Sequence, residues 1–229
     1  MNRKLLKSFI AVFFLSFAGI GFAKPAAVSS LSAADLKDFD KNPPEVKKLI
    51  KSALALTKQN LTYKYGSNHP KNKGMDCSGT INYLLKLNGL KAPRQADQQY
   101  LWTKNTGNFT PTIGTYSLID AKFNNLKPGD ILFWRGTYNI KRLASHSMIY
   151  LGIEKKTNRP VMFGASDGRR HNGKRITGVS VFDFVLPKKG KKAKFLGYGP
   201  IPGLSYGNTA IASKSKKKCR FFKFLCKKK

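Results

Sequence analysis

The hydrophobic pattern of this chain changes its period part-way along, and that change limits the folds open to it. Between residues 43 and 89, apolar side chains recur at the spacing of amphipathic helices. Pro43-Pro44 opens the first predicted helix, since proline is tolerated in a first turn, and the helix runs to about Gln59. The second begins at Cys77 and ends near Asn88-Gly89, which suits a C-terminal stop.

The later part of the chain reads as short strands between turn residues. The predicted strands are 131–135, 145–153, 161–165, 178–185 and 195–198, with a short helix within 92–102. Helices first and antiparallel strands later predict an α+β fold, with the N-terminal helices packed on a central antiparallel sheet. Residues 195–204 are expected to close the domain as a strand and loop, while 103–125 reads as a long insert that could gate a cleft.

Residues 1–23 have the layout of a cleavable signal peptide: early basic residues, an apolar run and small residues before the expected cut after Ala23. The apolar run is shorter than the roughly 20 residues that cross a bilayer, which favours cleavage over a retained anchor. We therefore expect an exported protein, periplasmic or extracellular. Residues 24–42 are predicted to be a linker or short leading segment, 43–204 a single domain, and 205–229 a basic, partly aromatic tail.

The formal net charge of +32 predicts an affinity for polyanions. Export argues against nucleic acid as the partner and leaves acidic lipid headgroups or anionic wall polymers. The charge is densest in 188–194 and 214–229, where the last run alternates basic with aromatic residues. This tail could lie on a membrane surface or wall polymer; a disordered basic tail is the alternative.

The chain has three cysteines, and an odd number in an exported protein leaves at least one free thiol. Cys219 and Cys226 could bridge each other, although their pairing stays open. Cys77 stands apart in Asp76-Cys77-Ser78-Gly79 at the start of a predicted helix. Asp76 suits the N-cap, and a thiol in the first helical turn is expected to have a lowered pKa and to act as a nucleophile. The alternative is a small buried core residue.

A nucleophilic cysteine needs a base, and the chain offers three histidines. His69 and His171 lie in polar loops and are expected to be exposed surface residues. His146 opens a predicted strand, from which its imidazole can reach a helix N-terminus. The sequence therefore favours Cys77 and His146 as a pair over a purely structural His146.

Several motifs occur together in a characteristic order. They are Tyr63-Lys64-Tyr65-Gly66-Ser67, Asp76-Cys77-Ser78-Gly79, Pro93-Arg94 with Gln99, Leu126 to Phe133 around Pro128-Gly129-Asp130, and the His146 strand. From about Val46 to Val185 the chain resembles the NlpC-type peptidoglycan endopeptidases, which have a papain-like fold and a Cys–His pair. The resemblance implies a cell-wall enzyme that needs no metal or cofactor and acts on peptidoglycan stem peptides.

The resemblance also implies roles for individual residues. Cys77 would attack an amide carbonyl to give a thioester, and His146 would hold the thiolate and protonate the leaving amine. The Cys77 amide and the Tyr63 hydroxyl would stabilise the oxyanion. Asp76 and Ser78 match positions that hold the free amine end of the stem peptide. Arg94 and Gln99 match the pattern as well, with a structural role as the alternative.

Two positions depart from the pattern. Relatives often carry a histidine that orients the catalytic imidazole where this chain has Gly164. Ser166 shares a strand face with Gly164, and Asp167 offers a carboxylate, so Asp167 is the first candidate orienter and Ser166 the second. The other departure is Ala96, where relatives frequently have serine in the substrate cleft. Two alternatives to hydrolysis remain open: a catalytically weak wall-binding protein of this fold, and an acyltransferase.

Overall fold

The computed structural model of the chain describes residues 25–138 and 141–207. The predicted signal peptide, Cys219, Cys226 and the basic run 214–229 lie outside the described residues. None of the described helices is long and apolar enough to cross a membrane.

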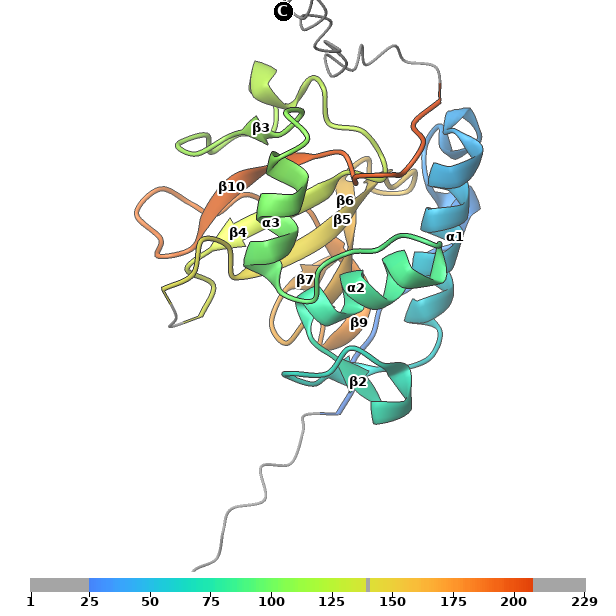
Figure 1. The fold of residues 1–229 in the computed structure, drawn as a ribbon. Helices are drawn as coiled ribbons and strands as arrows, with labels where there is room; N and C mark the ends of the chain where they lie inside the picture. The colour runs from blue at the N-terminus through green and yellow to red at the C-terminus, as the bar shows by residue number, and fades with distance from the viewer. Residues whose placement is uncertain (1–24, 139–140, 208–229) are drawn as a thin grey trace, which may run out of the picture.

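A six-stranded sheet forms the centre of the structure, and helices gather on one side of it (Figure 1). The helices are α1 (Pro44–Thr57), α2 (Cys77–Leu87) and α3 (Ala96–Lys104). The sheet strands are β3 (Thr110–Pro111), β4 (Ile131–Arg135), β5 (His146–Ile153), β6 (Pro160–Ser166), β9 (Gly178–Asp183) and β10 (Lys194–Gly199). Their order is β3-β10-β4-β5-β6-β9, and all neighbours are antiparallel. The predicted α+β class, with helices packed on an antiparallel sheet, is confirmed.

Two small ribbons stand beside the main sheet. β1 (Thr62–Tyr63) pairs in parallel with β2 (Gly74–Met75), and β7 (Arg170–His171) pairs antiparallel with β8 (Lys174–Arg175). The first ribbon leads into α2, and the second extends the chain beyond the end of β6.

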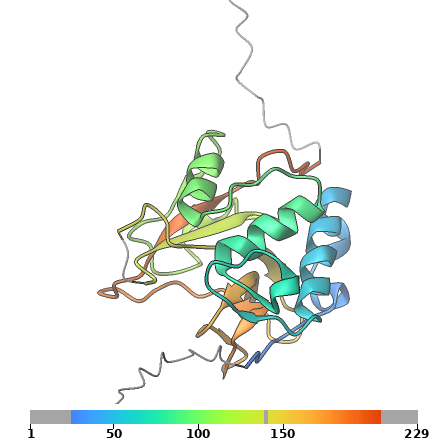
Figure 2. The ribbon, with the colours of Figure 1, turned by 60° about the horizontal axis from the view of Figure 1, so that its bottom comes forward.

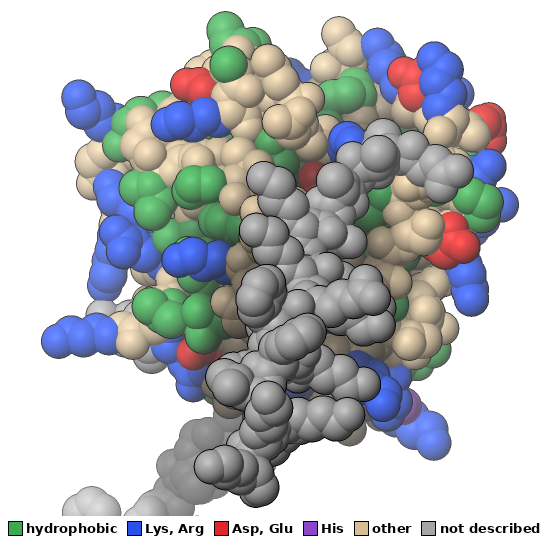
Figure 3. Space-filling view, turned by 45° about the horizontal axis from the view of Figure 1, so that its top comes forward, with side chains coloured by type: hydrophobic (Ala, Val, Ile, Leu, Met, Phe, Trp, Pro, Cys, Tyr) green, Lys and Arg blue, Asp and Glu red, His purple; other side chains and the backbone are tan. Residues whose placement is uncertain are grey.

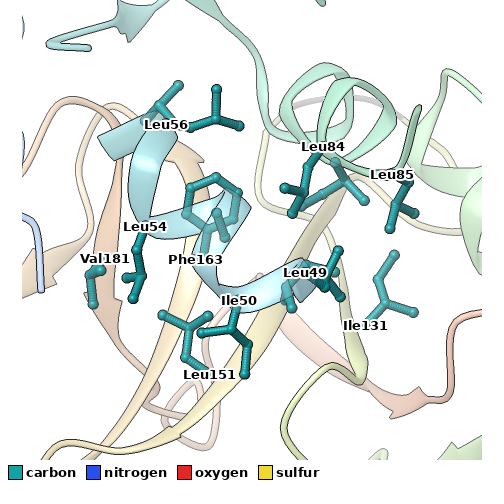
Figure 4. Close-up of a cluster of buried hydrophobic side chains, with 14 of the residues drawn as sticks. Leu49, Ile50, Leu54, Leu56, Leu84, Leu85, Ile131, Leu151, Phe163 and Val181 are labelled. Carbon is teal, nitrogen blue, oxygen red and sulfur yellow. The ribbon is translucent and has the colours of Figure 1, made fainter. Parts of the chain in front are cut away.

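The helix-covered face of the sheet holds the larger apolar core. Helices α1 and α2 lie next to each other over this face (Figure 2). Figure 4 shows the α1 and α2 side chains pointing toward those of the strands: Leu49, Ile50, Leu54, Leu84, Leu85, Ile131, Leu151, Phe163 and Val181. Full burial of each such side chain contributes roughly 1.5–3 kcal/mol, so this contact fixes α2 on the sheet and with it the position of Cys77.

The other face carries a second core rich in aromatic side chains, and the predicted insert contributes Phe123 to it. Within it, Phe123 stacks on Phe195 and Tyr198, with ring centroids 6.1 and 5.9 Å apart. Trp134 joins the same aromatic cluster at 4.9 Å from Phe195. Strand alternation explains the two cores, because Ile131 and Phe133 face the helices while Leu132 and Trp134 face this cluster.

The leading segment is packed against the domain. Leu36 and Phe39 are buried in the main core, and the amide of Ala27 donates to the carbonyl of Thr177 at 2.8 Å. Residues 25–42 therefore pack against the domain at these points.

Candidate active site

Helix α2 begins at Cys77 because Asp76 caps it. Oδ1 of Asp76 accepts from the amide of Gly79 at 2.7 Å, and Oδ2 accepts from the amide of Gly66 at 2.9 Å. A Cβ atom at Gly79 would lie 2.2 Å from the carbonyl oxygen of Ser67, so only glycine lets this loop press against the helix. The predicted N-cap is confirmed, and it places Cys77 in the first helical turn.

Arg94 completes the surroundings of the Asp76 carboxylate. Its Nη2 lies 2.6 Å from Oδ2 and its Nη1 lies 3.1 Å from Oδ1, so the guanidinium binds both oxygens. Nη1 also donates to Oγ of Ser78 at 3.1 Å. With the two amide donors, the roughly four acceptor positions of a carboxylate are occupied.

Gln99 ties the start of α2 to strand β5. This fully buried side chain donates to the carbonyls of Ser78 and Pro93, both at 2.9 Å, and accepts from Oγ of Ser147 at 2.6 Å. Ser147 directly follows His146. Gln99 therefore holds the two elements that carry Cys77 and His146 in a fixed relation, which is a structural role.

Cys77 is buried, with 5% of its surface exposed, and its Sγ lies 3.9 Å from the carbonyl oxygen of Ser145. Burial above all, and then the charge of Asp76, raise the pKa of the thiol to about 11. The helix N-terminus leads one to expect the opposite direction. Desolvation outweighs the helical amides here, so the free protein holds a neutral thiol.

His146 is the first residue of β5 and pairs with Trp134 of β4, its ring 5.7 Å from the indole. Nε of Arg169 donates to Nε2 of His146 at 3.4 Å. Burial first, and then the Arg169 charge, hold the pKa of His146 well below 6.5. The imidazole is therefore neutral, and in the free protein its one acceptor nitrogen, Nε2, is occupied by the Arg169 hydrogen bond, which leaves the ring proton on Nδ1.

Two adjoining cavities open beside Cys77 and His146. Cys77 lines one of about 280 Å³, together with Asp76 and Ser78, and His146 lines the other, of about 460 Å³. Both cavities share the same three aromatic walls: Tyr63, Tyr65 and Tyr138. The thiol faces the carbonyl of the residue before His146, and the two candidate catalytic side chains line one cavity each.

Comparison with known proteins agrees with this arrangement. The NlpC/P60 family model matches residues 60–174, half of the chain, including Cys77 and His146. The chain belongs to the NlpC/P60 family. The papain-like α+β fold follows from this membership.

Curated relatives match part of their length only. Over 90 residues, which are 39% of this chain and 18% of the relative, it is 36% identical to the gamma-DL-glutamyl hydrolase of Bacillus subtilis (strain 168). Over 128 residues, 54% of this chain and 34% of the relative, it is 29% identical to the bifunctional muramidase/DL-endopeptidase CwlT of the same organism. The chain thus spans about a fifth to a third of these relatives.

Solved structures of the family also match. An NLP/P60 family protein of Staphylococcus aureus, described as similar to a lipoprotein, has a TM-score of 0.43 and 18% identity, covering 76% of this chain and 44% of that one. NlpC1 of Trichomonas vaginalis has a TM-score of 0.42 and 22% identity, covering 67% and 44%.

The structure explains one departure from the NlpC/P60 pattern. A Cβ atom at Gly164 would lie 2.9 Å from Cγ of Met148, which stands two residues after His146 on the same face of the sheet. Met148 therefore fills the space that an orienting side chain at position 164 would need.

Neither predicted orienter forms a hydrogen bond with His146 in the described part of the chain. Asp167 is exposed at the edge of the larger cavity, and Oγ of Ser166 accepts from the amide of Gly168 at 3.4 Å. The side chain that donates a hydrogen bond to His146 is Arg169, which sequence reasoning missed. One arginine among 43 Lys and Arg residues gives no distinguishing signal.

The structure also places the other residues that the sequence singled out, and one expectation about them is wrong. Tyr63 lines both cavities, and burial, followed by the nearby Cys77, raises the pKa of its hydroxyl. Ala96 lines the smaller cavity. His69 is exposed, as predicted. The expectation of an exposed His171 is wrong: this ring is buried, with Nδ1 2.6 Å from Oγ of Ser29 and Nε2 3.8 Å from Oε2 of Glu154.

Proposed function

We propose that this protein is a cysteine peptidase that hydrolyses amide bonds in peptidoglycan stem peptides. The observation that carries the proposal is the placement of Cys77 at the start of α2, facing the start of β5 where two cavities meet. Membership of the NlpC/P60 family supports it, as do relatives named as a glutamyl hydrolase and a DL-endopeptidase. We also propose export to the periplasm or cell exterior, where the wall is found.

In the proposed reaction the neutral pair acts when substrate is bound. Nε2 of His146, released from its hydrogen bond to Arg169, takes the thiol proton as Sγ of Cys77 attacks the amide carbonyl carbon, and a C–S bond forms. The tetrahedral intermediate then collapses, the C–N bond breaks, and His146 gives its proton to the leaving amine. Water then attacks the thioester carbon while His146 takes a proton from it. The C–S bond breaks, the acyl part leaves as a carboxylic acid, and His146 returns the proton to Sγ of Cys77.

The oxyanion would be stabilised by the Cys77 amide, which is a free donor as a first-turn N–H, and by the Tyr63 hydroxyl. Asp76 has a narrower role than the family resemblance implies. Because Gly66, Gly79 and Arg94 already occupy its oxygens, an amine of the substrate would have to displace one of these donors. We therefore assign Asp76 first to building the site.

A wall-binding protein with weak catalysis is the second candidate. It is favoured by the raised pKa of Cys77 and by a cationic neighbour, Arg169, at the imidazole where an acceptor was expected. Lys and Arg side chains also project at several separate points of the face that Figure 3 shows, which suits an anionic polymer.

Digestion of purified sacculi separates the two functions. The peptidase releases new stem-peptide fragments, identified by mass, that disappear with the Cys77→Ala variant. Sedimentation of both forms with sacculi, without fragments from either, would overturn the peptidase and support the binding protein.

A further inference from the structure

Part of the predicted insert, residues 112–120 (the insert loop), turns apolar side chains toward the outside of the molecule. Ile113, Tyr116 and Ile119 keep 52%, 46% and 95% of their surface exposed. Single exposed apolar residues are common on protein surfaces, but three of them within one short loop form a local concentration. Such a concentration indicates a surface that makes contact with something apolar.

Buried and exposed side chains of the insert loop alternate with a spacing of three. Thr112 and Thr115 are buried, and Leu118 packs against the aromatic core that contains Phe123. Each of the exposed apolar residues directly follows one of these three inward-facing residues. The inner side of the loop therefore fixes it to the domain, while the outer side presents the apolar side chains.

Hydrogen bonds hold the insert loop in this form. The amide of Thr112 donates to the carbonyl of Leu196 in β10 at 3.1 Å, and the amide of Thr115 donates to the carbonyl of Thr112 at 3.0 Å. At the other end, Oδ1 of Asp120 accepts from the amide of Lys122 at 2.9 Å and caps the 3-10 helix that follows. Because the loop is already ordered, a partner that binds its outer side does not have to order it.

Positive charge borders the insert loop. Nζ of Lys122 donates to Oγ1 of Thr115 at 3.4 Å, which places an ammonium group against the loop. Asp120 is the one carboxylate in the insert loop, and it is half-buried. The end of the molecule that carries β3 lies at the top of Figure 1 and comes forward in Figure 3, where hydrophobic side chains lie beside Lys and Arg side chains. Apolar groups bordered by cations match the boundary between anionic lipid headgroups and acyl chains.

We infer that the insert loop docks the protein on the surface of an anionic lipid membrane. Ile113 and Ile119 enter the acyl-chain boundary, Tyr116 lies at the level of the headgroups, and Lys122 contacts lipid phosphate. A hydrated wall polymer offers no apolar phase, so it would leave the two isoleucines in water. The inference goes beyond the proposed function and does not depend on peptidase activity.

Co-sedimentation of the full chain with vesicles of phosphatidylcholine and phosphatidylglycerol tests this inference. Full burial of one isoleucine corresponds to roughly 10- to 100-fold in affinity, so I113S/I119S should weaken vesicle binding by at least about 10-fold. Vesicles of phosphatidylcholine alone, or high salt, should weaken the binding of the unaltered protein. Leu87→Ser is the matched control, since Leu87 is 53% exposed but ends α2 on the helix-covered side of the sheet. Its binding should equal that of the unaltered protein.

A local probe separates the insert loop from residues 1–23 and the basic tail, which are present in every variant. Ile119→Trp adds a fluorophore to the two native ones, Trp102 and Trp134. Vesicles with brominated acyl chains should quench this added fluorescence, because bromine quenches only at short range. Leu87→Trp should show no added quenching under the same conditions.

Three results would overturn the inference. One is equal vesicle binding by I113S/I119S and the unaltered protein. Another is the absence of added quenching in Ile119→Trp while the protein is bound to vesicles. The third is a loss of sedimentation with sacculi in I113S/I119S at unchanged vesicle binding, since the loop would then bind the wall. None of these results touches the proposed function, which depends on the release of stem-peptide fragments.

Discussion

Arg94 donates two hydrogen bonds to the Asp76 carboxylate, from Nη2 to Oδ2 at 2.6 Å and from Nη1 to Oδ1 at 3.1 Å. Asp76 caps the helix that begins at Cys77. Asp76 is buried, while the Arg94 side chain is 31% exposed. The pair therefore connects the loop after α2 to the cap of α2, and it holds a buried charge that would otherwise be unpaired.

Arg94→Ala should lower the free energy of unfolding by about 2 kcal/mol, because it leaves a buried carboxylate without its cation. The partial exposure of Arg94 keeps the loss below that of a fully buried pair. Urea denaturation measures the change. Lys91→Ala, which removes an exposed charge nearby, should stay within about 0.5 kcal/mol of the unaltered protein. Equal effects of the two substitutions would contradict the role given to Arg94.

The reactivity of Cys77 should rise steeply with pH in the free protein. Burial raises the pKa of its thiol to about 11, so the thiolate fraction grows about tenfold per pH unit from pH 7 toward pH 10. Iodoacetamide labelling, followed by mass analysis of the peptide that contains Cys77, gives the rate separately from Cys219 and Cys226. A rate that is already constant between pH 6 and 8 would instead indicate a preformed thiolate–imidazolium pair.

Gly164→His should destabilise the fold by about 1–3 kcal/mol, because the new side chain meets Met148. Met148→Ala makes room for the new side chain at position 164. As a single substitution, Met148→Ala leaves a cavity and is itself destabilising. We expect the double substitution to cost at least 1 kcal/mol less than the sum of the single ones, as measured by chemical denaturation. Strict additivity would show that the two positions do not compete for the same space.

Asp130 should make the protein less stable as pH rises. Burial raises the pKa of its carboxyl from 3.8 to about 7, so the folded state favours the protonated form. The contribution of the protonated Asp130 carboxyl to the free energy of unfolding is fully present below about pH 4, and it is lost as the pH rises from about 4 to 7. Asp130→Asn should therefore be more stable than the unaltered protein at pH 8, by on the order of 1–3 kcal/mol, and the gap should narrow toward pH 4. A gap that is constant with pH would contradict this assignment.

The sequence predicts those parts of the site that local signals determine. Asp76 before a helical apolar pattern predicts the cap and hence the place of Cys77, and turn residues before an apolar run predict the strand that carries His146. The strand boundaries follow in the same way, with β4 at its predicted limits. These features depend on neighbours in the chain.

Features that depend on distant contacts could not be predicted. A helix N-terminus lowers the pKa of a thiol, but the burial that reverses the direction at Cys77 comes from the packed sheet. His171 lies in a polar turn, yet Ser29 of the leading segment and Glu154 bury it. Arg169 reaches His146 from the chain beyond β6, and Met148 occupies the space beside Gly164 across two strands.

The central claim is that Cys77 and His146 work as one catalytic unit, and the rates of three variants test it most directly. Release of fragments from sacculi should fall by at least about 10³-fold in Cys77→Ala and in His146→Ala. The double variant should be no slower than either single variant, because losing one member of the pair already removes the catalysis that the two residues provide together. Retained activity in Cys77→Ala, or a double variant whose loss equals the product of the two single losses, would contradict the account.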